Sequence, residues 1–96
     1  MTTYVVAKLN FTDENRYRRY QERFFDVFKH FDGTLCCADE APILLEGTRE
    51  IDKVVIMSFP SQPSALAFLE SPEYQQIAVD RKAGAETEAI LVEGWS

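Results

Sequence analysis

The chain has 96 residues, of which 46% are hydrophobic and 27% are charged, and its formal net charge is −6. A chain of this length predicts a single globular domain over residues 1–96, and an acidic domain repels phosphate backbones and anionic lipid. No apolar stretch approaches the roughly 20 residues that span a bilayer. We therefore expect no nucleic-acid partner and no membrane partner.

The N-terminus and the two cysteines indicate the compartment. The apolar run after Met1 has no basic region before it and is interrupted at Lys8, which argues against a signal peptide or an anchor. Cys36 and Cys37 are neighbours, and neighbouring side chains on a strand point to opposite faces, so the pair is poorly placed to form a disulfide. We expect a cytoplasmic protein without a metal or another cofactor, since a metal would need more Cys or His nearby.

The first third of the chain predicts a strand and then a long amphipathic helix. Residues 3–11 alternate with period two, as a half-buried strand does. Thr12 is predicted to cap the helix, and Gly33 is predicted to end it in a left-handed cap. Between them, apolar side chains recur at helical spacing: Tyr17, Tyr20, Phe24, Val27, Phe28 and Phe31.

The rest of the chain predicts two more strands, two short helices and a final strand. A strand over residues 34–39 is interrupted near Pro42 and resumes over residues 43–46, which favours an edge strand or a bulge. The next strand is apolar on both faces, which indicates a central position in the sheet. The remaining expected elements are a strand over 53–59, helices capped by Ser61 and by Ser71 with Pro72 at its first position, and a strand over 87–95.

This order predicts an α+β fold of the ferredoxin-like βαββαβ type, with a four-stranded antiparallel sheet and both helical segments on one face. Helices on one face leave the other face bare, yet apolar side chains occupy both. Strand alternation places Val54, Ile56, Ile90 and Val92 on one face and Val55, Met57, Phe59, Leu91 and Trp95 on the other. An exposed apolar patch of this size usually marks an interface, so we expect a homodimer that packs sheet against sheet.

One segment combines the end of a strand, a short helix and a capped second helix: Phe59-Pro60-Ser61, Ala65, Phe68, Ser71, Glu73, Tyr74 and Gln75. This pattern resembles the bacterial family catalogued as domain of unknown function 1330. Further matches extend the likeness over nearly the whole chain: Tyr4-Val5-Val6, Gly33, Leu45-Glu46-Gly47, Arg81 and Leu91-Val92-Glu93-Gly94.

The resemblance implies a dimeric α+β barrel, in which two ferredoxin-like sheets close into a barrel. The family has no established common activity. Its wider superfamily holds small monooxygenases, isomerases, decarboxylases and stress-response proteins, many of which act without a metal or an organic cofactor. The chain departs from the family pattern at residues 36–40 and near Arg49, so its ligand preference could differ from that of its relatives.

His30 is the only histidine and the only side chain whose ordinary pKa lies near neutrality. It is expected near the C-terminal end of the first helix. One interpretation is a general base or a ligand donor at the mouth of a cleft. The other is a histidine that complements the helix dipole.

Arg81 lies seven residues after Tyr74, so both side chains face the same way if one helix contains them. They would then offer a cation and an aromatic ring to an anionic ligand. The alternative is that Arg81 forms a structural ion pair with Glu73, Asp80 or Glu93 and that Tyr74 belongs to the core.

Two further side chains are candidates for the same cleft. Glu93 lies in an apolar strand and is the best candidate for a buried carboxylate suited to proton transfer. Tyr20 belongs first to the apolar stripe of the first helix, and its hydroxyl is also placed to enter an apolar pocket. No nucleophile motif, phosphate-binding loop or zinc spacing is present.

Two functional hypotheses follow. The first is a homodimer with a small cleft for an organic acid, in which Arg81 holds the anion and His30 or Glu93 moves a proton without a cofactor. The second is a non-catalytic dimer that binds a small molecule or has a structural role.

Overall fold

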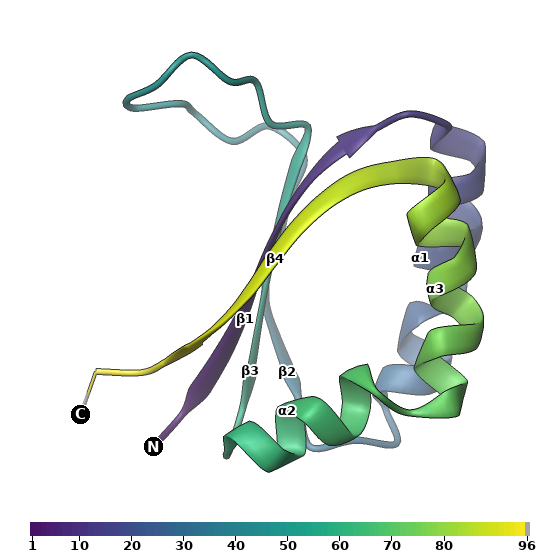
Figure 1. The fold of residues 1–96 in the computed structure, drawn as a ribbon, viewed down its shortest axis with the longest axis vertical. Helices are drawn as coiled ribbons and strands as arrows, with labels where there is room; N and C mark the ends of the chain where they lie inside the picture. The colour runs from purple at the N-terminus through teal and green to yellow at the C-terminus, as the bar shows by residue number, and fades with distance from the viewer. Residues whose placement is uncertain (96) are drawn as a thin grey trace.

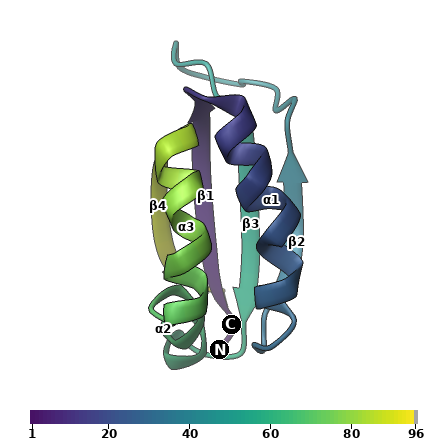
Figure 2. The same cartoon turned by 90° about the vertical axis from the view of Figure 1, so that its right-hand side faces the viewer.

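The computed structural model describes residues 1–95. Its elements are β1 (Thr3–Phe11), α1 (Glu14–Phe28), β2 (Thr34–Asp39), β3 (Lys53–Phe59), α2 (Gln62–Leu69), α3 (Pro72–Gly84) and β4 (Ala85–Glu93). The strands form one antiparallel sheet in the order β2-β3-β1-β4. The predicted ferredoxin-like βαββαβ fold is therefore confirmed, and β3 is central as expected. Figures 1 and 2 show α1 and α3 side by side on one face of the sheet, with α2 at one end.

The start of α1 differs from the prediction by one residue. Asp13, not Thr12, is the cap, because its carboxylate accepts a hydrogen bond from the backbone N–H of Arg16 at 3.3 Å. The N–H of Thr12 donates instead to the carbonyl of Gly84 at 2.9 Å. This bond joins the start of α1 to the end of α3, where a cavity described below lies.

Gly33 follows α1 but does not adopt the predicted left-handed conformation; Gly47 is the glycine with a positive φ among residues 1–95. A Cβ atom on Gly33 would lie 2.5 Å from the ring of Phe28 and 2.7 Å from the ring of Phe59. Glycine is therefore needed here because two buried rings approach the backbone, not because of a special dihedral angle.

Both short helices begin as predicted. The hydroxyl of Ser61 accepts from the N–H of Ser64 at 3.2 Å, and the hydroxyl of Ser71 accepts from the N–H of Tyr74 at 3.1 Å. Pro72 occupies the first position of α3. The Ser71 cap fixes where α3 begins and therefore which of its side chains face the sheet.

The segment over residues 40–52 is a loop, so the predicted return to a strand over 43–46 is wrong. The carboxylate of Asp39 accepts from the N–H of Ala41 at 2.8 Å and turns the chain as β2 ends. An extended segment needs a partner strand, and the loop projects beyond the end of the sheet (Figure 1). β2 itself is an edge strand with a register shift between Leu35 and Cys37, as the proline predicted.

The two faces of the sheet differ in what covers them. The side chains on the inner face pack against α1, α2 and α3, where the core forms. The outer face is uncovered in the single chain, and Ile90 is 59% exposed on it. No helix within residues 1–95 has the length and apolar character to cross a membrane. The cytoplasmic location stays a prediction.

Candidate functional site

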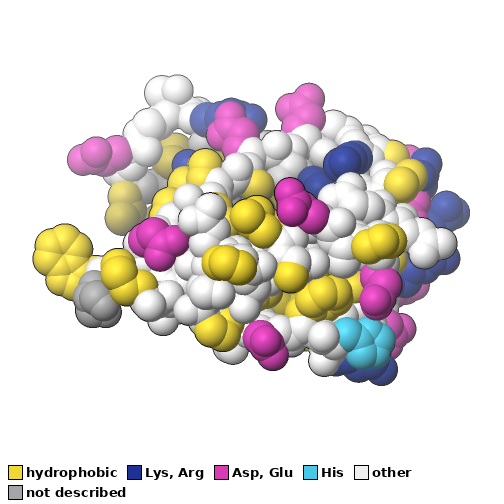
Figure 3. Space-filling model, turned by 60° about the horizontal axis from the view of Figure 1, so that its bottom comes forward, with side chains coloured by type: hydrophobic (Ala, Val, Ile, Leu, Met, Phe, Trp, Pro, Cys, Tyr) yellow, Lys and Arg dark blue, Asp and Glu magenta, His cyan; other side chains and the backbone are white. Residues whose placement is uncertain are grey.

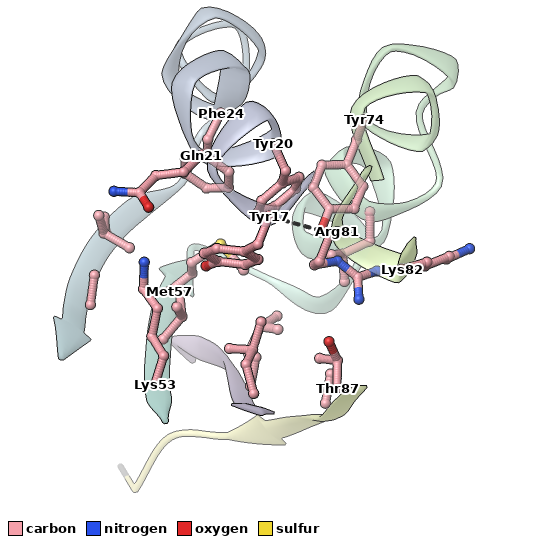
Figure 4. Close-up of a pocket in the computed structure, with 18 of the residues that line it drawn as sticks. Tyr17, Tyr20, Gln21, Phe24, Lys53, Met57, Tyr74, Arg81, Lys82 and Thr87 are labelled. Carbon is pink, nitrogen blue, oxygen red and sulfur yellow. Dashed lines mark hydrogen bonds between the residues drawn. The ribbon is translucent and has the colours of Figure 1, made fainter. Parts of the chain in front are cut away.

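A cavity of about 280 Å³ lies between α1, α3 and the inner face of the sheet. Its floor is one row of small side chains that the strand register places across all four strands: Ala38, Val55, Ala7 and Ala89. The next row carries the larger side chains of Leu35, Met57, Val5 and Leu91. Leu35, Met57 and Val5 of this second row also line the cavity. Figure 4 shows the side chains that line this space.

Tyr20 from α1 and Tyr74 from α3 meet at one wall of the cavity, and their hydroxyls form a buried hydrogen bond of 3.0 Å. Burial raises the pKa of Tyr20 well above its usual value, and the neighbouring Tyr74 raises it further. Tyr20 is therefore a neutral phenol that can donate a hydrogen bond but does not serve as a base at neutral pH.

Arg81 extends from α3 into the same space, with its guanidinium carbon 6.0 Å from the centre of the Tyr20 ring. Its Nε atom is buried and has no hydrogen-bond partner among residues 1–95. The acidic side chains considered as its structural partners are engaged elsewhere, at 2.7, 3.3 and 3.2 Å: Asp80 with Arg16, Glu73 with His30 and Glu93 with Thr3.

Thr87 on β4 provides a second unpartnered polar atom at the cavity. Its hydroxyl oxygen is also buried without a partner within the described part of the chain. Buried polar atoms are nearly always hydrogen-bonded to the protein or to water, so these two atoms in the lining of one cavity are available to a water or to a ligand. Thr87 was not among the predicted site residues, although it shares its strand face with Ala89 and Leu91.

Lys53, the first residue of β3, lies at the opposite wall and is only 4% exposed. Its ammonium is 3.3 Å from a carboxylate oxygen of Glu40 and 4.9 Å from the centre of the Tyr17 ring. Arg18 also binds Glu40 with two hydrogen bonds of 2.6 and 2.8 Å. The hydrogen bond from Arg18 is the main cause that lowers the pKa of Glu40 to about 2, and Lys53 contributes to the same shift.

Lys53 was not among the predicted site residues either. The available signal was its position, because it shares the inner face of β3 with Val55, Met57 and Phe59. A lysine on a face that is otherwise apolar requires a special environment.

The cavity collects positive charge in a chain whose net charge is −6. Its charged lining residues are Lys53, Arg81 and Lys82, and within residues 1–95 neither a carboxylate nor a histidine lines it. This arrangement suits an apolar molecule with an anionic group. Over the same residues no cluster of three or more His, Cys, Asp and Glu side chains is placed to hold a metal ion.

The structure thus brings together Arg81, Tyr74 and Tyr20 but not the other two predicted site residues. His30 follows the end of α1 on the surface, where its Nδ1 lies 3.3 Å from Glu73, and Figure 3 shows its cyan side chain exposed. Glu93 is exposed at the last position of β4, so the expectation of a buried carboxylate is wrong for the single chain. The role of either residue in proton transfer stays a prediction.

The sequence profile of one protein family, described as a domain of unknown function (DUF1330), matches residues 2–95. No curated protein matches the chain.

Several solved structures share the fold at low sequence identity. A protein of unknown function from Rhodopseudomonas palustris has a TM-score of 0.83 at 16% identity and covers 99% of this chain and 83% of its own. SnoaB from Streptomyces nogalater, a cofactor-independent oxygenase, has a TM-score of 0.72 at 14% identity over 99% of this chain and 94% of its own. A dimeric ferredoxin-like protein of unknown function from Thermobifida fusca has a TM-score of 0.65 at 11% identity. The match covers 96% of this chain and 90% of its own.

Proposed function

Because the chain belongs to the family of domain of unknown function 1330, whose description names no reaction, we propose its function from the cavity itself. We propose that the protein is a homodimer in which each subunit binds a small organic acid between α1, α3 and the sheet. The observation that carries this proposal is the pair of buried, unpartnered polar atoms of Arg81 and Thr87 in one cavity.

The size and lining of the cavity support the binding of one small molecule. Its volume of about 280 Å³ is close to the lower end of the range of about 300–1,000 Å³ found for ligand sites. Aromatic and aliphatic side chains would enclose the body of the ligand, while its carboxylate would accept hydrogen bonds from Arg81 Nε and Thr87 Oγ1. Charge-assisted hydrogen bonds of this kind are about twice as strong as neutral ones.

The same lining favours binding over proton transfer. General acid–base catalysis needs a group that can take up a proton within hydrogen-bond reach of the substrate. The hydroxyl of Tyr20 is held neutral, and the ammonium of Lys53 lies 3.3 Å from the carboxylate of Glu40. The proposed proton carriers His30 and Glu93 are absent from the lining. Of the two functional hypotheses, ligand binding is therefore the better supported.

The uncovered face of the sheet supports the homodimer. One register row runs across all four strands and is apolar throughout: Cys37, Ile56, Val6 and Ile90. Val92 is also exposed on this face. Packing this face against a second copy would remove these side chains from water.

A thermal-shift titration with small aromatic acids, beginning with benzoate, tests the binding proposal. A ligand at about 100 times its Kd stabilises a protein by about 2.7 kcal/mol, which for a domain of this size raises Tm by on the order of 10 °C. The Arg81→Met variant should lose this rise, whereas Arg23→Met, which changes an exposed arginine outside the cavity, should keep it. An equal response of both variants would refute the proposed site.

Light scattering at micromolar concentration tests the homodimer, for which we expect twice the chain mass of 11.0 kDa. Ile90→Lys should yield the monomer. The matched control is Val79→Lys, since Val79 is also 59% exposed but lies on α3, away from the uncovered sheet face. A wild-type mass of 11.0 kDa would contradict the proposal.

A further inference from the structure

Lys53 is a buried cation that the proposed carboxylate site at Arg81 and Thr87 does not use. Only 4% of the residue is exposed, and it lines the cavity from the first position of β3. Burying an ammonium group is unfavourable unless its charge and its hydrogen-bond donors are satisfied. The partners of this lysine therefore decide what the cavity can accept.

Those partners satisfy Lys53 only in part. An ammonium carries three donors, and the acceptor within reach in the described chain is one oxygen of Glu40 at 3.3 Å. Arg18 holds the same carboxylate through shorter bonds of 2.6 and 2.8 Å, so the negative charge of Glu40 is already shared. The face of the Tyr17 ring, at 4.9 Å, is attractive to the cation but accepts no strong hydrogen bond.

The strand register relates Lys53 to the first binding position. Lys53 on β3 and Thr87 on β4 both pair with Leu9 on β1, so the three residues form one row across the sheet. At a strand spacing of about 4.8 Å, the backbones of Lys53 and Thr87 are about 10 Å apart. Leu9 is 1% exposed and provides an apolar floor between them.

Figure 4 shows the same arrangement from the side-chain view. Arg81 and Thr87 lie on one side of the cavity and Lys53 on the other, with the ring of Tyr17 between them. The cavity therefore has a cationic position at each end and an aromatic and aliphatic middle. A flat, rigid apolar body with an oxygen group at each end would complement this pattern.

We propose that the ligand is a rigid, two-ended aromatic acid, with one carboxylate at Arg81 and Thr87 and a second anionic or carbonyl oxygen at Lys53. This inference rests on the proposed function and adds the second end of the ligand to it. Lys53 then acts as a specificity-determining residue, because it distinguishes a two-ended acid from one with a single acidic group.

Isothermal titration of matched pairs of probes tests this inference in the wild-type protein. Benzoate is compared with terephthalate, and 2-naphthoate with naphthalene-2,6-dicarboxylate, so that each pair differs by one carboxylate and the pairs differ in length. In at least one pair we expect the diacid to bind about tenfold tighter or more, as one added charge-assisted hydrogen bond predicts.

Two variants test whether Lys53 causes the preference for the diacid. Lys53→Met keeps a side chain of similar length and leaves Glu40 bound by Arg18, so it should abolish the preference for the diacid over the monoacid. Lys29→Met, at an exposed lysine after α1, should change neither.

The outcomes separate the two proposals. Monoacids that bind as tightly as both diacids in the wild-type protein would overturn the second position and leave the proposed function intact, even if Lys53→Met fails to fold. A preference that survives Lys53→Met would overturn the role of Lys53. Binding of none of the four probes would count against the proposed organic-acid site and therefore against both proposals.

Discussion

The layer between the helices and the sheet has two ends that differ in packing. At the end near α2, the ring of Phe68 is fully buried and lies between 4.6 and 6.0 Å, centre to centre, from five other aromatic rings: Tyr74, Phe28, Phe31, Phe59 and Phe24. Towards the other end, the same helices and the same strands line a cavity of about 280 Å³, which shares Tyr74 and Phe24 with this cluster and has polar atoms in its wall.

This difference suggests a division of roles within one small domain. Close-packed rings contribute dispersion and burial at the solid end, which stabilises the fold. The open end has fewer such contacts and contains buried polar atoms without partners, which is unfavourable in the free protein. Substitutions at the two ends should therefore affect stability in different ways.

The largest loss of folding stability is expected in the cluster of rings around Phe68. Phe68→Ala removes a side chain with 0% exposure and should destabilise the fold by about 3–5 kcal/mol, because it leaves a cavity among rings that are fixed in place. Urea unfolding measures the loss. Phe25→Ala is the control, since Phe25 is 56% exposed on α1, and an equal loss in both variants would contradict the division between the two ends.

A smaller loss is expected for Tyr20→Phe. This change removes the 3.0 Å hydrogen bond and leaves the hydroxyl of Tyr74 unpaired, so we expect a destabilisation of about 1–2 kcal/mol. Tyr74→Phe should cost a similar amount, and the double variant should cost less than the sum, because no hydroxyl remains unpaired. Additive losses in a double-mutant cycle would show that the two hydroxyls are not coupled.

Thr87→Val should raise the free energy of unfolding, whereas the changes above lower it. It replaces a buried, unpartnered hydroxyl with a methyl group of similar size, so the free protein should gain about 1 kcal/mol while its affinity for benzoate falls. Thr3→Val is the matched control on the same sheet face, because its buried hydroxyl donates to Glu93 at 3.2 Å and its loss should destabilise the protein. If thermal unfolding shows both variants to be destabilised, Thr87 has a partner in solution.

The smallest effect concerns pH. The pKa of Glu40 is lowered from its ordinary value to about 2, so its ion pairs contribute stability above about pH 4.5 and lose it as the pH falls towards 2. Glu40→Gln should therefore lower the free energy of unfolding at pH 7, by about 1 kcal/mol or less because the carboxylate is 38% exposed. The difference from wild type should shrink below pH 4.5; a constant difference down to pH 2 would contradict the ion-pair account.

Most of the fold follows from local patterns that tertiary contacts reinforce. The period-two pattern of residues 3–11, the Ser61 and Ser71 caps and the apolar stripe of α1 all predict what the structure contains. The failures come from partners that a local pattern does not reveal. Residues 43–46 have the composition of a strand but no neighbouring strand to pair with. A glycine is required at position 33 because the rings of Phe28 on α1 and Phe59 on β3 lie against its backbone.

The candidate site was predictable in part. Helical spacing correctly placed Arg81 and Tyr74 at one wall, because one helix contains both residues. Lys53 and Thr87 were not predicted because the strand alternation was applied to apolar residues alone. Both residues nevertheless occupy positions whose side chains lie on the inner face of the sheet. Arg81 Nε has no partner within residues 1–95 because Asp80 and Glu73 pair with residues of other elements. Spacing along the sequence does not reveal such pairs.

The central claim is that Arg81 Nε–H donates a hydrogen bond to the carboxylate of the ligand. NMR tests this claim most directly. In a ¹H–¹⁵N spectrum, the Arg81 Nε–H signal is assigned by its loss in Arg81→Lys and is then followed as benzoate is added. The account predicts a downfield shift of this proton that saturates with the binding isotherm, since the buried N–H gains a carboxylate acceptor. An Arg81 signal that stays in place while benzoate binds would contradict the central claim.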